Sequence, residues 1–342
     1  MILIDAQYIN EGGGKVLLYY LIENFEKMDI DFFFLLDERI RYDLPTIKSS
    51  NRIEFLSGSF LKRHWFYKRN RNRFSKVFCF ANLPPSIRLK CEVFTYFQNV
   101  VFLEVPNEYS KLQKIKFDLK RQVLKYFDPN TTCWLVQSDL VKNKLQSKLD
   151  VNSAKVLVLP FYPQFEKCTT NVIRERQTYI YVSNGMPHKN HIRLINVFCE
   201  FYDRYKKGKL ILTIGEDFPV LTTLIADKVK KGYPIENIGF VDRATLQKLY
   251  LHSEFLIFPS LTESFGLGLI EAIECGCKIL GADLAYTYEV CEPSIVFNPL
   301  SNESMFEAFE KSLQDDIIDS VPKIKNNINE LINLLQSTNA TN

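Results

Sequence analysis

The stretch Phe258-Pro-Ser-Leu-Thr-Glu263-Ser-Phe-Gly-Leu-Gly-Leu-Ile-Glu271-Ala joins a buried strand, a polar loop and the start of a helix. The apolar run ends where Pro259 interrupts the hydrogen bonding of a strand. The two glycines let the backbone approach a ligand, and the first turn of a helix has unpaired N–H donors and a partial positive charge. The stretch therefore predicts a diphosphate site at the start of this helix. Glu263 and Glu271 could also be ordinary acids near a helix start.

The same alternation of strand and helix runs through the whole chain, which predicts parallel sheets covered by helices on both faces. The helices expected in the first half include Lys15–Met28 and Lys111–Tyr126. The strands expected there are Ile2–Ala6, Phe32–Leu36, Ile53–Leu56, Val77–Ala81, Val100–Val105, Cys133–Val136 and Val156–Leu159. In the second half we expect strands at Tyr179–Val182, Leu210–Ile214, Ile238–Phe240, Phe255–Phe258 and Lys278–Gly281, with helices between them.

At 342 residues the chain has room for two domains. We expect an N-terminal Rossmann-like domain over residues 1–165, a polar linker over 166–177 and a C-terminal Rossmann-like domain over 178–318. A terminal helix follows within 319–342 and could dock on the N-terminal domain. Two such α/β domains would leave a cleft at the carboxyl ends of their strands, where sheets of this kind bind ligands.

Two further motifs place glycines and a cation at the ends of expected strands. Tyr179-Ile-Tyr-Val-Ser-Asn184-Gly-Met-Pro-His188-Lys189 puts Lys189 at a helix start, where a cation could neutralise a leaving nucleoside diphosphate. A lone lysine at such a place is usually a solvated side chain. The segment 10–15, Asn-Glu-Gly-Gly-Gly-Lys, follows the first strand and is either a ligand-binding loop or a plain tight turn.

The spacing of Glu263 and Glu271 resembles the E-x7-E signature of retaining glycosyltransferases of family 4, which have the two-domain GT-B fold. The resemblance implies that Glu263 holds hydroxyls of the donor sugar and that Glu271 holds the ribose. It also implies that the backbone of Ser264, Phe265, Gly266 and Leu267 faces the diphosphate and the sugar. By this resemblance Glu263 and Lys189 are the catalytic candidates.

The resemblance extends to other donor-binding positions, and it is dense over residues 178–300 and thin over 1–160. It gives this role to Gly13, Gly14, Asn184, Gly185, His188, Gly215, Phe240 and Val241. Many family members have an arginine five residues before the phosphate-binding lysine, where this chain has Asn184. His188 or another basic residue would then have to supply the second positive charge.

The family's chemistry implies transfer of a hexose-type sugar from a nucleotide-sugar donor to a saccharide acceptor, with retention of the anomeric configuration. The acceptor would be lipid-linked, as in the biosynthesis of bacterial surface polysaccharides such as O-antigen, capsule or lipopolysaccharide. No cofactor and no metal ion are expected, because no Asp-x-Asp motif stands in a donor loop. The rival activities are a nucleotide-sugar epimerase of the same architecture and, more remotely, nucleic-acid binding.

The N-terminal half is basic. Residues 1–160 contain 25 Lys and Arg against 17 Asp and Glu, a net of +8, and the remainder has 18 against 23, a net of −5. Segments 60–76 and 111–125 carry much of this charge and could contact anionic lipid headgroups, single-stranded nucleic acid or only solvent. The prediction is a membrane surface and no nucleic acid. The polar candidates on the acceptor side are His64, Asn99, Glu104 and Glu108.

The sequence contains no apolar run of the roughly 18 residues that a membrane-spanning helix requires. Met1 leads directly into a strand-like segment without the pattern of a signal peptide. The eight cysteines have no framework spacing, and the pair Cys275-Gly-Cys277 is expected to be two buried thiols rather than half of a metal site. These features predict a cytoplasmic protein that associates peripherally with the inner face of the membrane.

Overall fold

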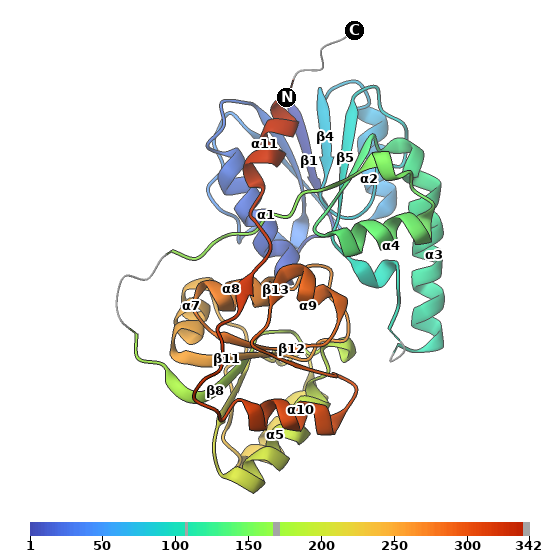
Figure 1. Cartoon of the computed structure of the whole chain (residues 1–342). Coiled ribbons are helices and arrows are strands. Elements are labelled where there is room, and N and C mark those ends of the chain that lie inside the picture. Colours follow the sequence, from blue (N-terminus) through green and yellow to red (C-terminus); the bar gives the residue numbers. More distant parts are fainter. Residues whose placement is uncertain (107–108, 167–171, 338–342) are drawn as a thin grey trace. The chain divides into compact units, whose positions relative to one another are not determined.

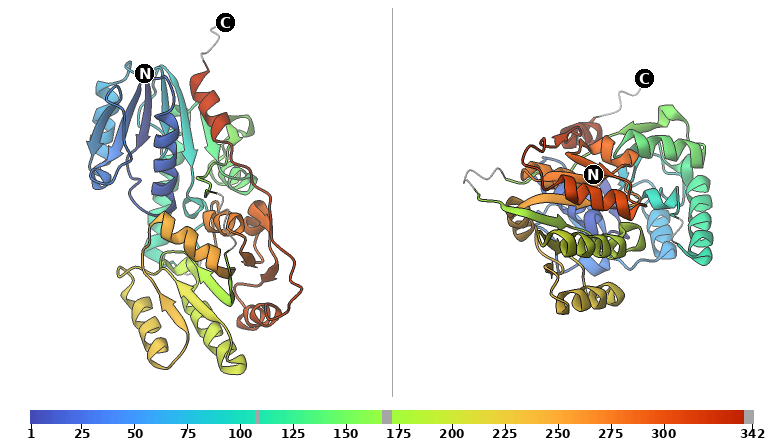
Figure 2. Two further views of the ribbon diagram at one scale, coloured as in Figure 1. Left: turned by 90° about the vertical axis from the view of Figure 1, so that its left-hand side faces the viewer. Right: turned by 60° about the horizontal axis from the view of Figure 1, so that its bottom comes forward.

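The computed structural model describes residues 1–106, 109–166 and 172–337, which form two compact α/β units. Unit 1 comprises residues 1–105, 110–163 and 325–342, and unit 2 comprises residues 106–109 and 164–324. The ribbon in Figures 1 and 2 shows helices on both faces of each sheet. None of the helices within the described ranges is both long and apolar enough to cross a membrane.

Unit 1 is built on a seven-stranded parallel sheet in the order β3-β2-β1-β4-β5-β6-β7. The strands are β1 (Ile2–Ala6), β2 (Phe32–Asp37), β3 (Arg52–Leu56), β4 (Lys76–Cys79), β5 (Glu92–Phe97), β6 (Cys133–Val136) and β7 (Val156–Val158). Strands β1, β2 and β4 are buried along their whole length, as expected for the centre of a sheet with two covered faces. The order of the strands reverses between β1 and β4.

The helices of unit 1 follow the strands in sequence. They are α1 (Gly12–Phe25), α2 (Phe60–Arg69), α3 (Lys111–Phe127), α4 (Asp139–Leu149) and α11 (Ile328–Gln336), with short 3-10 turns η1 (Glu38–Ile40), η2 (Val100–Phe102), η3 (Asp128–Asn130) and η4 (Ser153–Lys155). Ser59, Ser110 and Ser138 cap α2, α3 and α4 by accepting a backbone N–H of the first turn. These caps fix where each helix begins.

Helix α11 belongs to unit 1, although more than 160 residues of unit 2 separate it from the rest of that unit. The side-chain amide of Asn326 donates to the Tyr20 hydroxyl at 2.9 Å and to the Tyr162 carbonyl at 2.8 Å. The buried Lys76 ammonium donates to the carbonyl oxygens of Leu334 and Ser337 near the end of α11. The last helix therefore completes the first unit.

Unit 2 is built on a six-stranded parallel sheet in the order β10-β9-β8-β11-β12-β14, which reverses direction between β8 and β11. Its strands are β8 (Glu175–Tyr181), β9 (Lys209–Leu212), β10 (Ile235–Asn237), β11 (Ser253–Phe258), β12 (Lys278–Ala282) and β14 (Ile295–Phe297), and the short β13 (Cys291–Glu292) and β15 (Val321–Pro322) form an antiparallel pair. Its helices are α5 (His191–Tyr205), α6 (Pro219–Lys230), α7 (Arg243–His252), α8 (Leu267–Glu274), α9 (Ala285–Val290) and α10 (Asn302–Lys311), with the 3-10 turn η5 (Pro187–Lys189).

Two expected strands differ from the structure. The apolar run Val100–Val105 was predicted to be a strand, but it begins with the turn η2, because Val100 and Leu103 lie on one side of that turn and are both buried. The strand lies earlier, at β5. No strand forms at Ile238–Phe240. Strand β10 ends just before this segment, because Gly239 has a φ of +68° and turns the chain.

The boundary between the units also differs in detail from the expected linker over 166–177. Strand β8 begins at Glu175, inside that range, and residues 167–171 lie outside the described part of the chain. The polar residues Glu175 and Arg176 concealed the strand, because they lie at its exposed start and break the apolar run. The short segment 106–109 groups with unit 2 rather than with its sequence neighbours.

Candidate functional site

The reversal of strand order in unit 2 places two loops side by side at the carboxyl ends of β8 and β11. A switch point of this kind is where open α/β sheets bind ligands. The loop after β8 contains Asn184, Gly185, His188 and Lys189, and the loop after β11 contains Glu263 and leads into α8. Both loops carry the motifs that the sequence singled out.

Lys189 and Glu263 meet between these loops. The Lys189 Nζ donates to Glu263 Oε1 at 2.5 Å, and the two side chains are 15% and 13% exposed. The pair is therefore shielded from bulk water and still open at one side. A ligand can replace this ion pair at little cost in free energy. Lys189 would then pair with a phosphate and Glu263 with a sugar hydroxyl, so that both groups remain paired.

Backbone hydrogen bonds hold the two loops in register. The Leu261 N–H donates to the His188 carbonyl at 2.8 Å, and the Tyr181 hydroxyl donates to the Lys189 carbonyl at 3.0 Å. Asn190 has a left-handed φ of +62°, and its side-chain amide donates to the carbonyls of Pro259 and Pro299 at 3.3 and 2.8 Å. Lys189 thus extends from a rigid turn rather than from a loose loop.

Helix α8 begins beside this pair without a side-chain cap. Its N-cap is Gly266, in the left-handed region at φ +73°, and this residue makes no side-chain cap. Gly268 packs against the Phe258 ring, where an added Cβ would lie 3.3 Å from the nearest atom. Phe265 is buried, and Ser264 and Leu267 are half-buried. The amides of this turn can bind an anion, as expected from the sequence.

Glu271 lies in the middle of α8 and is buried, in an ion pair with Arg243 at the start of α7. Burial raises the pKa of Glu271 to about 7, and Arg243 opposes this rise. The Arg243 guanidinium also lies over the Phe165 ring, 4.1 Å from its centroid. The sequence predicted that Glu271 binds the ribose of the donor. The structure adds Arg243 as a cationic partner of Glu271, which the sequence did not reveal.

His188 cannot supply the positive charge that is missing at Asn184. Burial and the neighbouring Lys189 lower the pKa of His188 to about 4, so the imidazole is neutral at physiological pH. Its Nδ1 lies 3.2 Å from the Tyr109 hydroxyl, and the two rings are stacked. Tyr109 was missed by the sequence analysis, because it precedes the other residues of this unit by more than 50 positions.

The remaining donor-binding candidates of unit 2 differ in the space around them and in their exposure to solvent. An added Cβ at Gly185 would lie 2.4 Å from the Phe218 ring, so only glycine fits there, whereas the space beside Gly215 is open. Phe240 is 89% exposed and Val241 is half-buried. Asn184 is exposed, and its carbonyl accepts from His191 Nε2 at 2.9 Å.

Gly13 and Gly14 lie in the first turn of α1, in unit 1. Gly12 has a φ of +60°, the N-cap Glu11 makes no side-chain cap, and an added Cβ at Gly13 would meet no atom within 4 Å. This helix start is therefore open to a ligand of unit 1. The sequence candidates fall into two groups, one in each unit.

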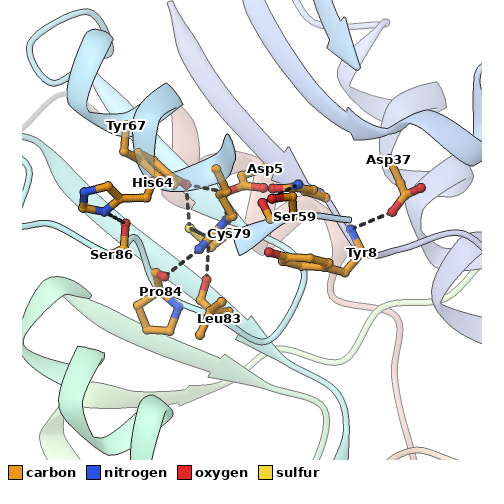
Figure 3. Close-up of polar contacts among 12 residues, drawn as sticks. Asp5, Tyr8, Asp37, Ser59, His64, Tyr67, Cys79, Leu83, Pro84 and Ser86 are labelled. Atoms are coloured by element: carbon orange, nitrogen blue, oxygen red, sulfur yellow. Dashed lines mark hydrogen bonds and ion pairs between the residues drawn. The ribbon is translucent and has the colours of Figure 1, made fainter. Parts of the chain in front are cut away.

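The carboxyl ends of β1, β2 and β4 in unit 1 carry a buried polar network (Figure 3). Asp5 Oδ2 accepts from the Arg63 guanidinium at 2.8 Å and from the Tyr67 hydroxyl. Arg63 also donates to the carbonyls of Leu83 at 2.7 Å and Pro84 at 2.9 Å. The ion pair therefore fixes the loop that follows β4.

The neighbouring loop after β1 is held by the same network. Tyr8 has a left-handed φ of +86°, and its N–H donates to Asp37 Oδ2 at 3.2 Å. The Gln7 side-chain amide donates to the Ser57 carbonyl at 2.6 Å, while its buried oxygen has no hydrogen-bond partner among the described residues. None of these side chains was chosen from the sequence, because their partners lie 29 to 62 positions away.

The acceptor-side candidates chosen from the sequence are scattered over unit 1. His64 Nδ1 lies 2.8 Å from the Ser86 hydroxyl, close to the network. Asn99 precedes the turn η2, and Glu104 pairs with Lys144 at 2.6 Å, which lowers its pKa. Glu108 lies outside the described residues. His64 is the candidate nearest to the loop after β4.

Unit 2 matches a known protein family along nearly its whole length. The family model described as glycosyl transferases group 1 matches residues 166–331. Most of unit 2 is therefore similar to the glycosyl transferases of this group. "O-antigen chain mannosyltransferase B" of Escherichia coli is 28% identical over 40% of this chain and 37% of its own length. "O-antigen chain mannosyltransferase RfbU" of Salmonella typhimurium is 24% identical over 64% of this chain and 60% of its own length.

The chain thus spans less than two thirds of these curated relatives. A solved structure with the same fold is that of Anabaena Alr3699/HepE in complex with UDP and glucose, with a TM-score of 0.68 and 12% identity over 92% of this chain and 90% of that chain. Units 1 and 2 contain the two parallel α/β sheets of the GT-B type.

The described residues of units 1 and 2 include no group of three or more His, Cys, Asp or Glu side chains that could hold a metal ion. Cys275 and Cys277 are both buried free thiols, and burial raises the pKa of each to about 12. They are therefore protonated at neutral pH.

The basic segment 60–76 contributes fewer surface charges than its sequence indicates. Arg63 is buried in its pair with Asp5, and Lys76 is buried against α11 and Glu92. These two cations belong to the interior of unit 1, so they were wrongly included in a surface patch. The other cations of segment 60–76 are exposed.

His191, at the start of α5, gives unit 2 a pH-dependent stability. Burial lowers the pKa of His191 to about 4, from about 6.5 in the unfolded chain. The unfolded state therefore binds more protons between these values, and stability that is complete above pH 6.5 is lost as the pH falls toward 4. Between pH 7 and 4, we expect the free energy of unfolding of His191→Gln to fall by roughly 1–3 kcal/mol less than that of the parent.

The measurement is urea unfolding of the parent and of His191→Gln at several pH values, followed by circular dichroism. His188, with its lowered pKa, and Glu271, with its raised pKa, are present in both proteins and cancel in the difference. Equal slopes with pH in the two proteins would show that His191 does not titrate as described.

Proposed function

We propose that the whole chain transfers a hexose-type sugar from a nucleotide-sugar donor to a saccharide acceptor in the biosynthesis of a bacterial surface polysaccharide. The family match of unit 2 supports the transferase activity. The two O-antigen mannosyltransferases support the polysaccharide context. The UDP and glucose bound by the structurally similar Anabaena protein support a nucleotide sugar as the donor class.

The observation that carries this proposal is the junction of Lys189, Glu263 and the uncapped start of α8 at the switch point of unit 2. A nucleoside diphosphate leaving group needs a cation and N–H donors, and a sugar needs a carboxylate that accepts from its hydroxyls. The junction offers all three within two adjacent loops. Glu271, one helix turn further on, is the proposed ligand of the ribose. Arg243 would remain paired with Glu271 when the ribose is bound.

In the proposed reaction the bond between C1 of the sugar and the diphosphate oxygen breaks, and the electron pair leaves with the diphosphate. Lys189 and the amides of Gly266 and Leu267 would stabilise the negative charge that develops on that oxygen, and one preorganised donor of this kind typically contributes about 2.7–4 kcal/mol. The acceptor hydroxyl attacks C1 from the side of the leaving group, and its proton passes to the phosphate. The sugar therefore keeps its anomeric configuration.

Metal independence is part of the proposal, with Lys189 and the start of α8 in the role that a divalent cation has in other transferases. Equal turnover in excess chelator and in added Mg²⁺ supports this part, and activity that requires added metal contradicts it. The acceptor is proposed to be linked to a lipid, as in the assembly of surface polysaccharides at the cytoplasmic face of a membrane.

The first test is thermal unfolding of the full chain with UDP-, GDP- and ADP-sugars, because a ligand that binds only the folded state raises the unfolding temperature. We expect one nucleotide class to stabilise the parent by about 3 kcal/mol at a hundredfold excess over its dissociation constant, and Lys189→Ala to lose most of this effect. Stabilisation by none of the nucleotide sugars would contradict the proposal. Conversion of the donor in the absence of acceptor would indicate an epimerase.

A further inference from the structure

Helix α3 of unit 1 is apolar on two faces, although only one of them is buried. Leu124 and Phe127 are buried against the unit, and Phe117 packs on Phe102. A second apolar stripe runs along the outer face of the helix. It consists of Leu112 (73% exposed), Ile115, Leu119, Val123 and Tyr126 (78% exposed).

The spacing of this stripe, which we call the α3 stripe, follows the helix repeat closely. At 3.6 residues per turn its five side chains fall within about a quarter of the circumference, over a length of roughly 20 Å. Exposed lysines lie on both sides of it, with Lys111 on one side and Lys116 and Lys120 on the other. A helix face that only contacts water is normally polar, so this face requires an apolar partner.

A cationic hollow adjoins the end of the α3 stripe. It has a volume of about 690 Å³, and Tyr126 is one of its walls. Lys68, Arg71 and Arg88 contribute the charge of this hollow, and no acidic residue is among its lining residues within the described chain. The hollow continues into a second one of about 920 Å³ that shares Arg71 and Arg88.

The exposed face of α2 extends the same surface. The Phe60 ring stacks on Phe127 with centroids 5.9 Å apart, which joins the start of α2 to the end of α3. Leu61 and Trp65 are 68% and 55% exposed, one helix turn apart, and the Lys68 ammonium lies over the Trp65 ring. Apolar side chains, an exposed tryptophan and a group of cations thus form one continuous area.

We propose that this area docks unit 1 on an anionic phospholipid bilayer, with the α3 stripe inserted among the acyl chains and the hollow holding a lipid phosphate. The flanking lysines and the interfacial positions of Trp65 and Tyr126 match the chemistry of a charged headgroup layer. Among the described residues, no carboxylate lines the hollow beside its three cations. An anionic headgroup therefore neutralises their charge. A protein partner or a second chain would have to match both the stripe and the hollow.

The proposal is tested with the full chain and vesicles of phosphatidylcholine alone or with 30% phosphatidylglycerol, separated by flotation. No catalysis is needed, so a failure here is distinct from a failure of the transferase proposal. We expect the parent to bind the anionic vesicles at least about tenfold more tightly than the neutral ones. Absence of binding to the anionic vesicles would overturn the proposal.

Two variants separate the stripe from the hollow. Ile115→Asp with Leu119→Asp is expected to weaken binding to both vesicle types by about tenfold or more, because charge replaces inserted apolar side chains. Lys68→Gln with Arg71→Gln and Arg88→Gln is expected to abolish the preference for phosphatidylglycerol and leave weak binding to neutral vesicles. Parent-like binding by either variant overturns the corresponding part of the proposal.

Matched controls use exposed residues of unit 2. Val220→Asp with Val229→Asp introduces the same charges on α6, and Lys207→Gln with Lys230→Gln and Lys231→Gln removes the same number of cations. Both controls are expected to bind as the parent does. An equal loss in the controls would mean that net charge alone governs binding. A dimer in light scattering that the stripe variant dissociates would identify a second chain as the occupant and overturn the proposal.

Discussion

Lys189→Ala and Glu263→Gln are each expected to lower kcat/KM by about a hundredfold or more with the donor identified by thermal unfolding. Alanine removes the only cation that the described structure places beside Glu263, so the departing diphosphate loses its counter-charge. Glutamine keeps the shape of Glu263 and removes the charge that pairs with Lys189 and that we propose orients a sugar hydroxyl. The measurement is steady-state transfer from the donor, with product separated by chromatography.

Exposed residues of the same unit provide matched controls for these substitutions. Lys207→Ala and Glu303→Gln change the same residue types far along the chain from both loops and should leave kcat/KM within about twofold. The double variant of Lys189 and Glu263 should cost less than the sum of the two single changes, since the residues contact each other. Near-normal turnover in either single variant would remove that residue from the catalytic role.

Arg63→Met is expected to lower the free energy of unfolding of unit 1 by about 3–5 kcal/mol. The change leaves the Asp5 carboxylate without its cation in the interior and leaves the Leu83 and Pro84 carbonyls without a donor. Both tryptophans of the chain, Trp65 and Trp134, lie in unit 1. Urea unfolding followed by tryptophan fluorescence therefore reports on this unit alone.

Arg69→Met on the same helix is the control, because Arg69 is exposed, and it should change the unfolding free energy by less than about 0.5 kcal/mol. Asp5→Asn combined with Arg63→Met should recover part of the loss, since the uncompensated charge is then absent. A loss of under 1 kcal/mol in Arg63→Met alone would show that the ion pair does not stabilise the fold as described.

Part of the candidate site in unit 2 could be predicted from the sequence, because the residues concerned follow one another in a single loop. Pro259, the following glycines and Glu263 stand together in one loop, and their order identified the start of α8. The pairing of Lys189 with Glu263 was not predictable, because 74 positions separate them and only the strand order joins their loops. The same reason concealed Tyr109 and the partner of Glu271.

The fold was predictable where strands are continuous apolar runs, as at β1, β2 and β11. It was not predictable where polar residues begin a strand, as Glu175 does in β8, or where an apolar run folds into a turn, as at η2. The surface charge was overestimated for a related reason. A basic sequence does not distinguish a solvated cation from one such as Arg63, which is buried on a carboxylate.

The return of α11 to unit 1 has a consequence for synthesis on the ribosome. The sheet of unit 1 emerges first, yet the Lys76 ammonium meets the carbonyls of Leu334 and Ser337 only after all of unit 2 has left the exit tunnel. Until then, nascent unit 1 lacks the contacts between its last helix and the start of β4. Maturation of the two units is coupled in time, and the earlier one is completed last.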